Sequence, residues 1–332
     1  MNPPRFDLAH FEQAHARIVS AIHRTPMLRS RTLSKLVGAP VYLKCENLQK
    51  TGAFKARGAL HRLLRLTDGQ RARGVATISA GNHAQAVAWA ATAAGVPSLV
   101  VMPEGASRTK VRASREYGAE VILHGDVEAA FAKVFALAEE RGMTFVHPFD
   151  DEEVVAGHGS CGLEIVDQVP SVHTIVVPVG GGGLSSAIAT SVAAAKPGVS
   201  VWGVEPKGAP SMHRSLQAGK AIHLESVNTV ADGLAPPMAG TLNHALLAAH
   251  AQGVVLVSDE EIIKALRVIL ERSKLLVEPS GAAAVAALLE GRIPVEAEQP
   301  VVAVLSGGNV DLEWLGTLLK DYPRAGGHAL DV

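Results

Sequence analysis

The sequence predicts an α/β protein of two domains, each a mostly parallel β-sheet flanked by helices. Its 332 residues suit two domains, at about 150 residues per domain. Hydrophobic residues make up 48% of the chain but aromatic residues only 4%, so the core is built from small aliphatic side chains, which suits helices packed on sheets. Between residues 41 and 305, short β-branched runs alternate with Ala- and Leu-rich segments of helical spacing, which is typical of βαβ units.

Most of the expected strands are continuous apolar runs, as parallel strands covered on both faces should be. We expect strands at 41–44, 75–78, 98–102, 121–123, 144–146, 174–179, 201–204, 254–257 and 301–305. The segments between them predict helices, most clearly at 82–94, 127–141, 184–195, 259–274 and 279–289. Residues 325–332 carry neither pattern and are expected to form a loose tail.

Charge and targeting features exclude several classes of protein. Lys and Arg total 31 against 32 for Asp and Glu, a net charge of −1, so no nucleic-acid partner is expected. The most apolar stretch, 86–102, is interrupted by Thr92, Gly95 and Pro97, so no membrane partner is expected either. The N-terminus shows no export signal, and two cysteines are too few for a disulfide framework. These observations favour the cytoplasm.

The first two of four candidate functional segments place polar groups at the start of helices. Segment 51–58 reads TGAFKARG, and its Lys55 is either a solvated helix residue or an amine whose surroundings depress its pKa enough for it to form a Schiff base. Segment 79–83 closes a strand and opens a helix. Its backbone N–H groups are suited to an anion, with Gly81 allowing close approach, unless Asn82 is only a helix cap.

The third and fourth segments follow strands directly. Four glycines, 180–183, stand between strand 174–179 and a helix, and their entropic cost favours a phosphate cradle over a bare turn. Ser306 begins the fourth segment, 306–310, just beyond strand 301–305. Because ligands bind at the carboxyl ends of strands in open parallel sheets, we expect the four segments to converge on one crevice.

A dinucleotide is the main rival for the glycine segment. The dinucleotide fingerprint requires Gly or Ala where this chain has Ser185 or, one residue later, Ser186. Glu205, at the end of the following strand, nevertheless stands at about the ribose-binding distance along the chain. An NAD-dependent oxidoreductase therefore stays open as a less favoured interpretation. A catalytically idle small-molecule binding protein is the third class.

Taken together, in this order and spacing, the four segments resemble the pyridoxal-phosphate enzymes of fold type II, the tryptophan synthase β-like family. The resemblance is closest to the short threonine/serine dehydratases and serine racemase, and it extends over residues 25–311. It implies a large pyridoxal-phosphate-binding domain formed by 1–74 and 149–332, and a small mobile domain formed by 75–148.

The resemblance also implies a role for each segment. Lys55 would carry pyridoxal phosphate and Ser306 would face its ring nitrogen, and these two are the implied catalytic residues. The ring and its phenolic oxygen would contact Phe54, Asn82 and Gly233. Backbone groups of the glycine segment would hold the cofactor phosphate: Gly180, Gly181, Gly182 and Gly183. Backbone groups of the loop before the helix would hold the substrate carboxylate: Ser79, Ala80, Gly81, Asn82 and His83.

The implied reaction is the dehydration of a β-hydroxy amino acid such as L-threonine or L-serine to a 2-oxo acid and ammonia. A hydroxyl at Ser306 leaves the ring nitrogen largely unprotonated, and this weaker electron sink favours loss of the β-hydroxyl over transamination. The alternatives within the family are an amino-acid racemase and a dehydratase of 3-hydroxyaspartate or another hydroxy amino acid. Ala80, where serine racemases carry Ser, favours dehydration alone, whereas Glu278 followed by Pro279 resembles the racemase branch.

The resemblance also implies a cation site and an oligomeric state. Glu205 and the carbonyl of Ala209 match two positions of the family's divalent-cation site, but Ser211 stands where a third, acidic ligand is usual. Hard cations need several oxygen ligands, so a weakened divalent site or a monovalent site is implied. The family also implies a homodimer or homotetramer.

Overall fold

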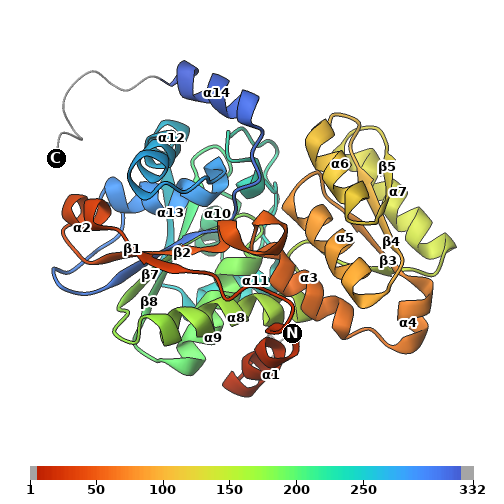
Figure 1. Cartoon of the computed structure of the whole chain (residues 1–332), viewed down its shortest axis with the longest axis horizontal. Helices are drawn as coiled ribbons and strands as arrows, with labels where there is room; N and C mark the ends of the chain where they lie inside the picture. Colours follow the sequence, from red (N-terminus) through yellow and green to blue (C-terminus); the bar gives the residue numbers. More distant parts are fainter. Residues whose placement is uncertain (1–5, 323–332) are drawn as a thin grey trace.

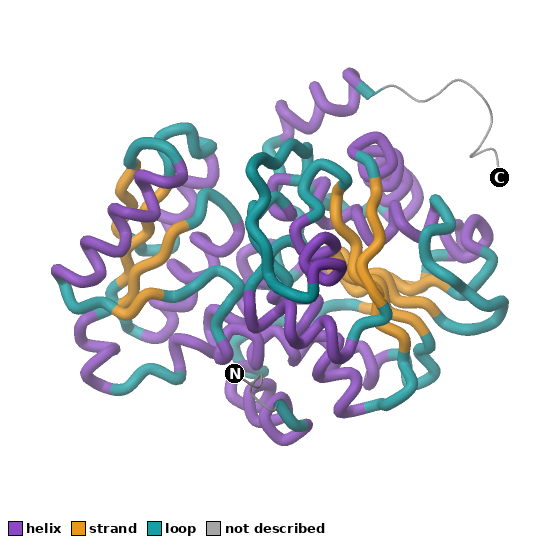
Figure 2. The backbone as a smooth tube through the Cα atoms, turned by 180° about the vertical axis from the view of Figure 1, so that it is seen from behind, coloured by secondary structure: helices purple, strands orange, loops and turns teal. Residues whose placement is uncertain are grey.

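A computed structural model describes residues 6–322 and confirms the predicted α/β class (Figure 1). The strands form two separate sheets, one of six strands and one of four, with helices against both (Figure 2). Residues 1–5 and 323–332, which include the tail expected to be loose, lie outside the described residues. None of the helices within 6–322 is long and apolar enough to cross a lipid bilayer.

The larger sheet has the strand order β1-β2-β10-β7-β8-β9. Its strands are β1 (Met27–Arg29), β2 (Val41–Cys45), β7 (Thr174–Pro178), β8 (Ser200–Pro206), β9 (Gly253–Val257) and β10 (Val301–Leu305). β1 pairs with β2 in the antiparallel sense, and the other neighbours are parallel. The central strands β10 and β7 are buried along their whole length, which explains their continuous apolar sequences.

Helices cover both faces of this sheet. Apolar side chains from one group of helices share a core with one face: α2 (Arg31–Val37), α12 (Asp259–Val268) and α13 (Pro279–Leu289). A second core lies on the other face, and it includes side chains of α8 (Glu152–Gln168), α9 (Gly183–Ala195), α10 (Ser211–Ala218) and α11 (Thr241–His250). In Figure 1, α12 and α13 are above the sheet and α8 and α9 below it.

The smaller sheet is wholly parallel, with the order β5-β4-β3-β6. Its strands are β3 (Val75–Ile78), β4 (Ser98–Met102), β5 (Glu120–Leu123) and β6 (Thr144–Phe145). One face packs against α7 (Val127–Glu140), and the other packs against α5 (Asn82–Ala94) and α6 (Arg108–Glu116). All of these elements lie within 75–148, the segment predicted to be the small domain.

One helix packs against the smaller sheet's layer and also belongs to the site. Helix α3 (Lys55–Leu64) buries Leu60 and Leu63 against Val87 and Ala91 of α5. The remaining described elements are α1 (Leu8–Ile18), α4 (Asp68–Arg73) and α14 (Leu312–Asp321), with the short 3₁₀ helices η1 (Glu46–Leu48), η2 (Lys50–Gly52) and η3 (Asp232–Leu234).

Two elements differ from the sequence-based expectation. The antiparallel strand β1 was not predicted because it is three residues long and lies partly in solvent, so it has no continuous apolar run. The helix expected at 259–274 is α-helical only to Val268. A π-helical turn, η4 (Ile269–Ser273), follows it and ends at Lys274, whose φ of 59° is left-handed. No Gly or Pro marks this change, so the apolar periodicity hides it.

Candidate active site

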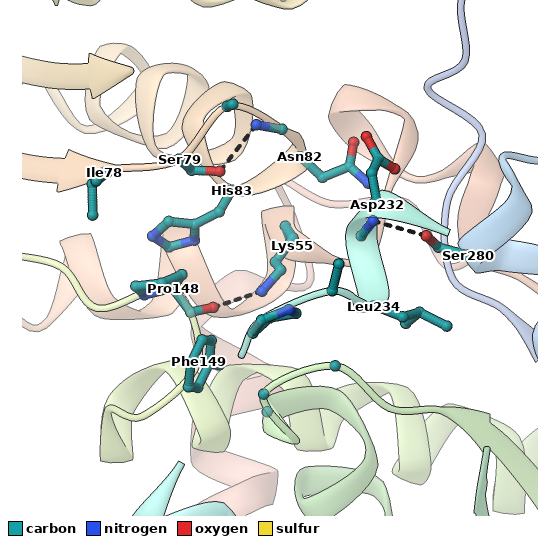
Figure 3. Close-up of a pocket in the computed structure, with 18 of the residues that line it drawn as sticks. Lys55, Ile78, Ser79, Asn82, His83, Pro148, Phe149, Asp232, Leu234 and Ser280 are labelled. Carbon is teal, nitrogen blue, oxygen red and sulfur yellow. Dashed lines mark hydrogen bonds between the residues drawn. The ribbon is translucent and has the colours of Figure 1, made fainter. Parts of the chain in front are cut away.

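The four candidate segments line one cavity of about 930 Å³ (Figure 3). The predicted cofactor- and substrate-contacting residues all line it: Phe54, Lys55, Ser79, Ala80, Gly81, Asn82, His83, Gly180, Gly181, Gly182, Gly183, Gly233 and Ser306. The predicted cation ligands Glu205 and Ala209 are not among its lining residues. The expected convergence on one crevice is therefore present.

Backbone hydrogen bonds join the lysine segment to the serine segment. Ala53 pairs with Gly307 in an antiparallel bridge, and the N–H of Phe54 donates to the carbonyl of Ser306 over 3.0 Å. The two segments follow β2 and β10, which are parallel neighbours in the larger sheet. Lys55 and Ser306 thus reach the same cavity because both strands end at the same edge.

Asn309 ties three of the segments together. Its Nδ2 donates to the carbonyl of Thr51 over 2.6 Å and to Oδ1 of Asn82 over 2.8 Å. The Nδ2 of Asn82 in turn donates to Oε1 of Glu278 over 2.7 Å. An amide nitrogen carries two N–H groups, so the contact with Glu278 leaves the second for a ligand.

Glu278 is a cavity residue whose place the sequence reasoning missed. Its carboxyl is buried, and burial, followed by the charge of Asp232, raises its pKa to about 8. At neutral pH it is therefore mostly protonated and able to donate a hydrogen bond as well as to accept one. Its position just before Pro279, the first residue of α13, was the only available signal.

Lys55 is a basic group of the cavity whose pKa is strongly lowered. Its Nζ donates to the carbonyl of Pro148 over 2.6 Å and lies 5.0 Å from the centre of the Phe54 ring. Burial lowers the pKa of its ammonium to about 8. Roughly a tenth of the amine is then neutral at pH 7, against under about a thousandth for a solvated lysine.

The glycine segment between β7 and α9 is packed so closely that it has no room for side chains. A Cβ at Gly181 would lie 2.4 Å from the ring of Phe149, and Gly182 has a left-handed φ of 96°. No side chain caps the start of α9. The first N–H groups of a helix lack intrahelical acceptors, so these suit an anion in the cavity.

Residues 18–307 match a protein family described as pyridoxal-phosphate dependent enzymes. The chain belongs to this family. The match spans both sheets, the first three segments and the first two residues of the fourth, so it covers the cavity as a whole rather than one motif.

Relatives of this pyridoxal-phosphate enzyme are named either as threonine ammonia-lyases (deaminases) or as serine racemases. The chain is 45% identical over 322 residues to an L-threonine ammonia-lyase of Geobacter sulfurreducens, covering 97% of this chain and 80% of that protein. The structure of maize serine racemase matches with a TM-score of 0.90 at 38% identity, covering 95% of this chain and 97% of the other. The structure of a threonine deaminase from T.th. matches with a TM-score of 0.87 at 42% identity, covering 92% and 99%. The predicted resemblance is confirmed.

The cavity fits pyridoxal phosphate in three respects. Lys55 supplies an amine of low pKa, and the glycine segment supplies an uncapped helix start at the cavity wall, which suits an anion. Ser306 supplies a buried hydroxyl at the cavity wall, and the carbonyl of Ser280 lies 3.5 Å from its Oγ, a long contact that leaves the hydroxyl free to turn to a ring nitrogen. An amine, an anion site and a partner for the pyridine nitrogen are the groups this cofactor needs.

A buried network of charges next to Lys55 was not apparent from the sequence. Arg57 is fully buried and donates two hydrogen bonds to each of Glu46 and Glu164, at 2.7 to 2.9 Å. Nζ of Lys44 donates to Glu164 over 2.6 Å. Two positive and two negative side chains therefore compensate one another inside the core, and they fix the first turn of α3.

Glu205 forms hydrogen bonds within the fold and does not line the cavity. It is fully buried, and its carboxylate oxygens accept hydrogen bonds from backbone N–H groups of α10. A ribose in the cavity is therefore out of its reach, which removes the observation that favoured a dinucleotide. Within 6–322, no group of three or more His, Cys, Asp or Glu that could hold a metal ion occurs, so Glu205 has no acidic partners for a divalent cation. The monovalent site implied by the resemblance stays a prediction.

Proposed function

We propose that this pyridoxal-phosphate enzyme is a threonine/serine ammonia-lyase, which converts L-threonine or L-serine to a 2-oxo acid and ammonia. The observation that carries the proposal is the half-buried, low-pKa amine of Lys55 in a cavity shared with the glycine segment and the Ser306 hydroxyl. The names of the Geobacter sulfurreducens and T.th. relatives support the same activity.

Lys55 would act as the base of the reaction. When bound, pyridoxal phosphate supplies an aldehyde and an electron-accepting ring. A lysine with a pKa near 8 accepts a proton from the substrate α-carbon and gives it up again close to neutral pH. The Pro148 carbonyl, 2.6 Å from Nζ, holds the freed amine beside the cavity.

The loop before α5 would bind the substrate carboxylate. Gly81 is the first half-helical residue of α5, and no side chain caps this helix. Its first N–H groups therefore suit a carboxylate, as at other helix starts. Ser79 Oγ accepts from the N–H of Gly81 over 3.1 Å and so fixes the turn (Figure 3).

Ala80 supports elimination rather than racemisation. Racemisation requires a second acid on the substrate face opposite Lys55, and Ala80 offers only a methyl group where serine racemases carry a hydroxyl. The alternative of a racemase rests on the likeness to maize serine racemase and on Glu278, whose protonated carboxyl is a proton donor in the cavity. 3-Hydroxyaspartate or another hydroxy amino acid is an alternative substrate.

The decisive experiment combines a variant with a substrate panel. Lys55→Ala is expected to lose the visible absorption of bound cofactor and all turnover, whereas Lys50→Ala, outside the cavity lining, keeps both. Ammonia release is then measured for L-threonine, L-serine, D-serine and 3-hydroxyaspartate. Turnover by Lys55→Ala, or interconversion of serine enantiomers without ammonia, would overturn the proposal.

We further propose the organisation of the enzyme. Residues 75–148 form a small domain that moves against the large domain of 1–74 and 149–332, as the separate sheets support. The family resemblance supports a homodimer or homotetramer, which light scattering on purified protein would measure.

Two buried free thiols, Cys45 and Cys161, support a reducing compartment such as the cytoplasm.

A further inference from the structure

The start of helix α10 is held by a buried carboxylate. Oε1 of Glu205 accepts from the N–H of Met212 over 2.7 Å and from Oγ of Ser211 over 3.3 Å. Oε2 accepts from the N–H of His213 over 2.7 Å. The residue before the helix is Pro210, which provides no cap of its own. Burial raises the pKa of Glu205 to about 8, so the group acts here as a hydrogen-bond acceptor rather than through its charge. Glu205 therefore caps α10 from the end of β8.

These contacts occupy most of the hydrogen-bond acceptor positions of Glu205. A carboxylate has about four acceptor positions, and three of them receive hydrogen bonds. A divalent cation of the Ca²⁺ or Mg²⁺ class takes six or more oxygens, so it would need carboxylates from elsewhere. Ser211, which stands at the third ligand position of the family site, donates to Glu205 instead.

Helix α10 in turn contacts the proposed phosphate cradle. Met212 is fully buried, and its methyl group Cε lies 2.6 Å from the point where a Cβ of Gly182 would stand. On the same loop, Nδ2 of Asn243 donates to the carbonyl of Gly181 over 3.1 Å. The position of Met212 therefore bears on the shape of the glycine segment.

We propose that Glu205 is a positioning residue that holds α10, and through Met212 the glycine cradle, without any bound cation. Cofactor binding by this chain is then independent of divalent cations. The inference rests on the proposed cofactor site but not on the substrate.

The test measures cation response on enzyme treated with EDTA. Melting temperature and the Kd for pyridoxal phosphate are determined with and without MgCl2 or CaCl2. We expect the melting temperature to change by less than about 1 °C and the Kd by less than about twofold, because a ligand without a site does not stabilise the fold. A rise of several degrees or a clearly tighter Kd with either cation would overturn the proposal.

Variants at position 211 test why the cation is excluded. Ser211→Asp supplies the missing carboxylate and is expected to gain stabilisation by MgCl2 or CaCl2. Ser211→Asn, of the same size but neutral, is the matched control and stays insensitive. If Ser211→Asp also fails to respond while its cofactor still binds, position 211 is not what excludes the cation and the argument fails.

Two further variants test the link to the cradle. Glu205→Gln is expected to weaken cofactor binding at least tenfold, with no rescue by cations, because its amide N–H groups face the N–H groups of α10. Met212→Ala keeps the cap and removes the contact with Gly182, so it weakens cofactor binding at an unchanged helix content by circular dichroism. It keeps the proposal testable if Glu205→Gln does not fold. Unchanged cofactor affinity in Met212→Ala would overturn the link, whereas loss of activity with cofactor bound would concern the proposed reaction instead.

Discussion

At the scale of single residues, the chemistry of the site depends on removing Lys55 from water. Lys55 has no carboxylate among its hydrogen-bond partners in the described structure; its Nζ donates to a carbonyl. Desolvation alone therefore lowers its pKa to about 8, from an ordinary value above 10. The same burial lowers the pKa of His83 beneath its usual range, helped by the nearby charge of Lys55. The cavity thus favours neutral bases.

This shift sets the expected pH dependence of cofactor attachment. Only the neutral amine attacks the cofactor aldehyde, so the attachment rate of the apoenzyme should rise about tenfold per pH unit below 8 and level off above it. Stopped-flow absorbance from pH 6.5 to 9.5 measures it. Free lysine under the same conditions is the control and continues to rise towards pH 10. A wild-type profile that also rises to pH 10 would contradict the assigned pKa.

Ser306 is expected to control the fate of the reaction. In Ser306→Asp, a carboxylate would keep the pyridine nitrogen protonated, strengthen the electron sink and raise the share of transamination. The measurement is the ratio of the cofactor's amine form to released ammonia after a fixed number of turnovers. Ser306→Thr retains a hydroxyl and is the control. Equal ratios in Ser306→Asp and wild type would count against the electron-sink argument.

At the scale of elements, the start of α3 depends on the Arg57 network. Removing one partner of a buried ion pair leaves the other charge uncompensated and costs about 3–5 kcal/mol. Arg57→Met should therefore lower the free energy of unfolding by roughly this amount in urea titration. Arg141→Met, which removes an exposed pair with Glu120, is the control and should leave the unfolding midpoint nearly unchanged. Similar midpoints in both variants would show that the network is not structural.

The same network shows where sequence reasoning stops. Strands 75–78, 98–102 and 301–305 were predicted with their observed bounds, because strands covered on both faces form nearly continuous apolar runs. Glu164 lies more than a hundred residues from Arg57 in the chain, Glu46 belongs to a different element, and each alone resembles an ordinary surface charge. Their pairing arises only in the tertiary structure, as do the contacts of Asn309 and Glu278 with Asn82. The four motifs could be predicted because each is contiguous in sequence.

At the scale of the whole molecule, the two sheets meet around the cavity and are connected across its mouth. Lys110, on α6 of the smaller unit, donates to Asp232, on η3 of the larger unit, over 2.6 Å. Both residues line the cavity. The Lys110 side chain is 19% exposed and that of Asp232 62%, so the pair is open to solvent and salt. Such a pair is weak enough to break and re-form as substrate enters and product leaves.

Breaking this pair should change substrate affinity more than the chemical step. Lys110→Met removes the charge while keeping most of the side-chain length, so we expect KM to rise by about fivefold or less, the limit set by a partly exposed pair, with kcat nearly unchanged. In wild type, KM should rise between 0.05 and 0.5 M KCl, as salt screens the pair, and this rise should be much smaller in Lys110→Met. Steady-state ammonia assays measure both. Arg112→Met is the matched control, because Arg112 lies on the same helix and pairs with Glu116 of that helix, and it should keep the wild-type salt dependence. If Lys110→Met and Arg112→Met respond to salt alike, the pair does not hold the two units together over the substrate.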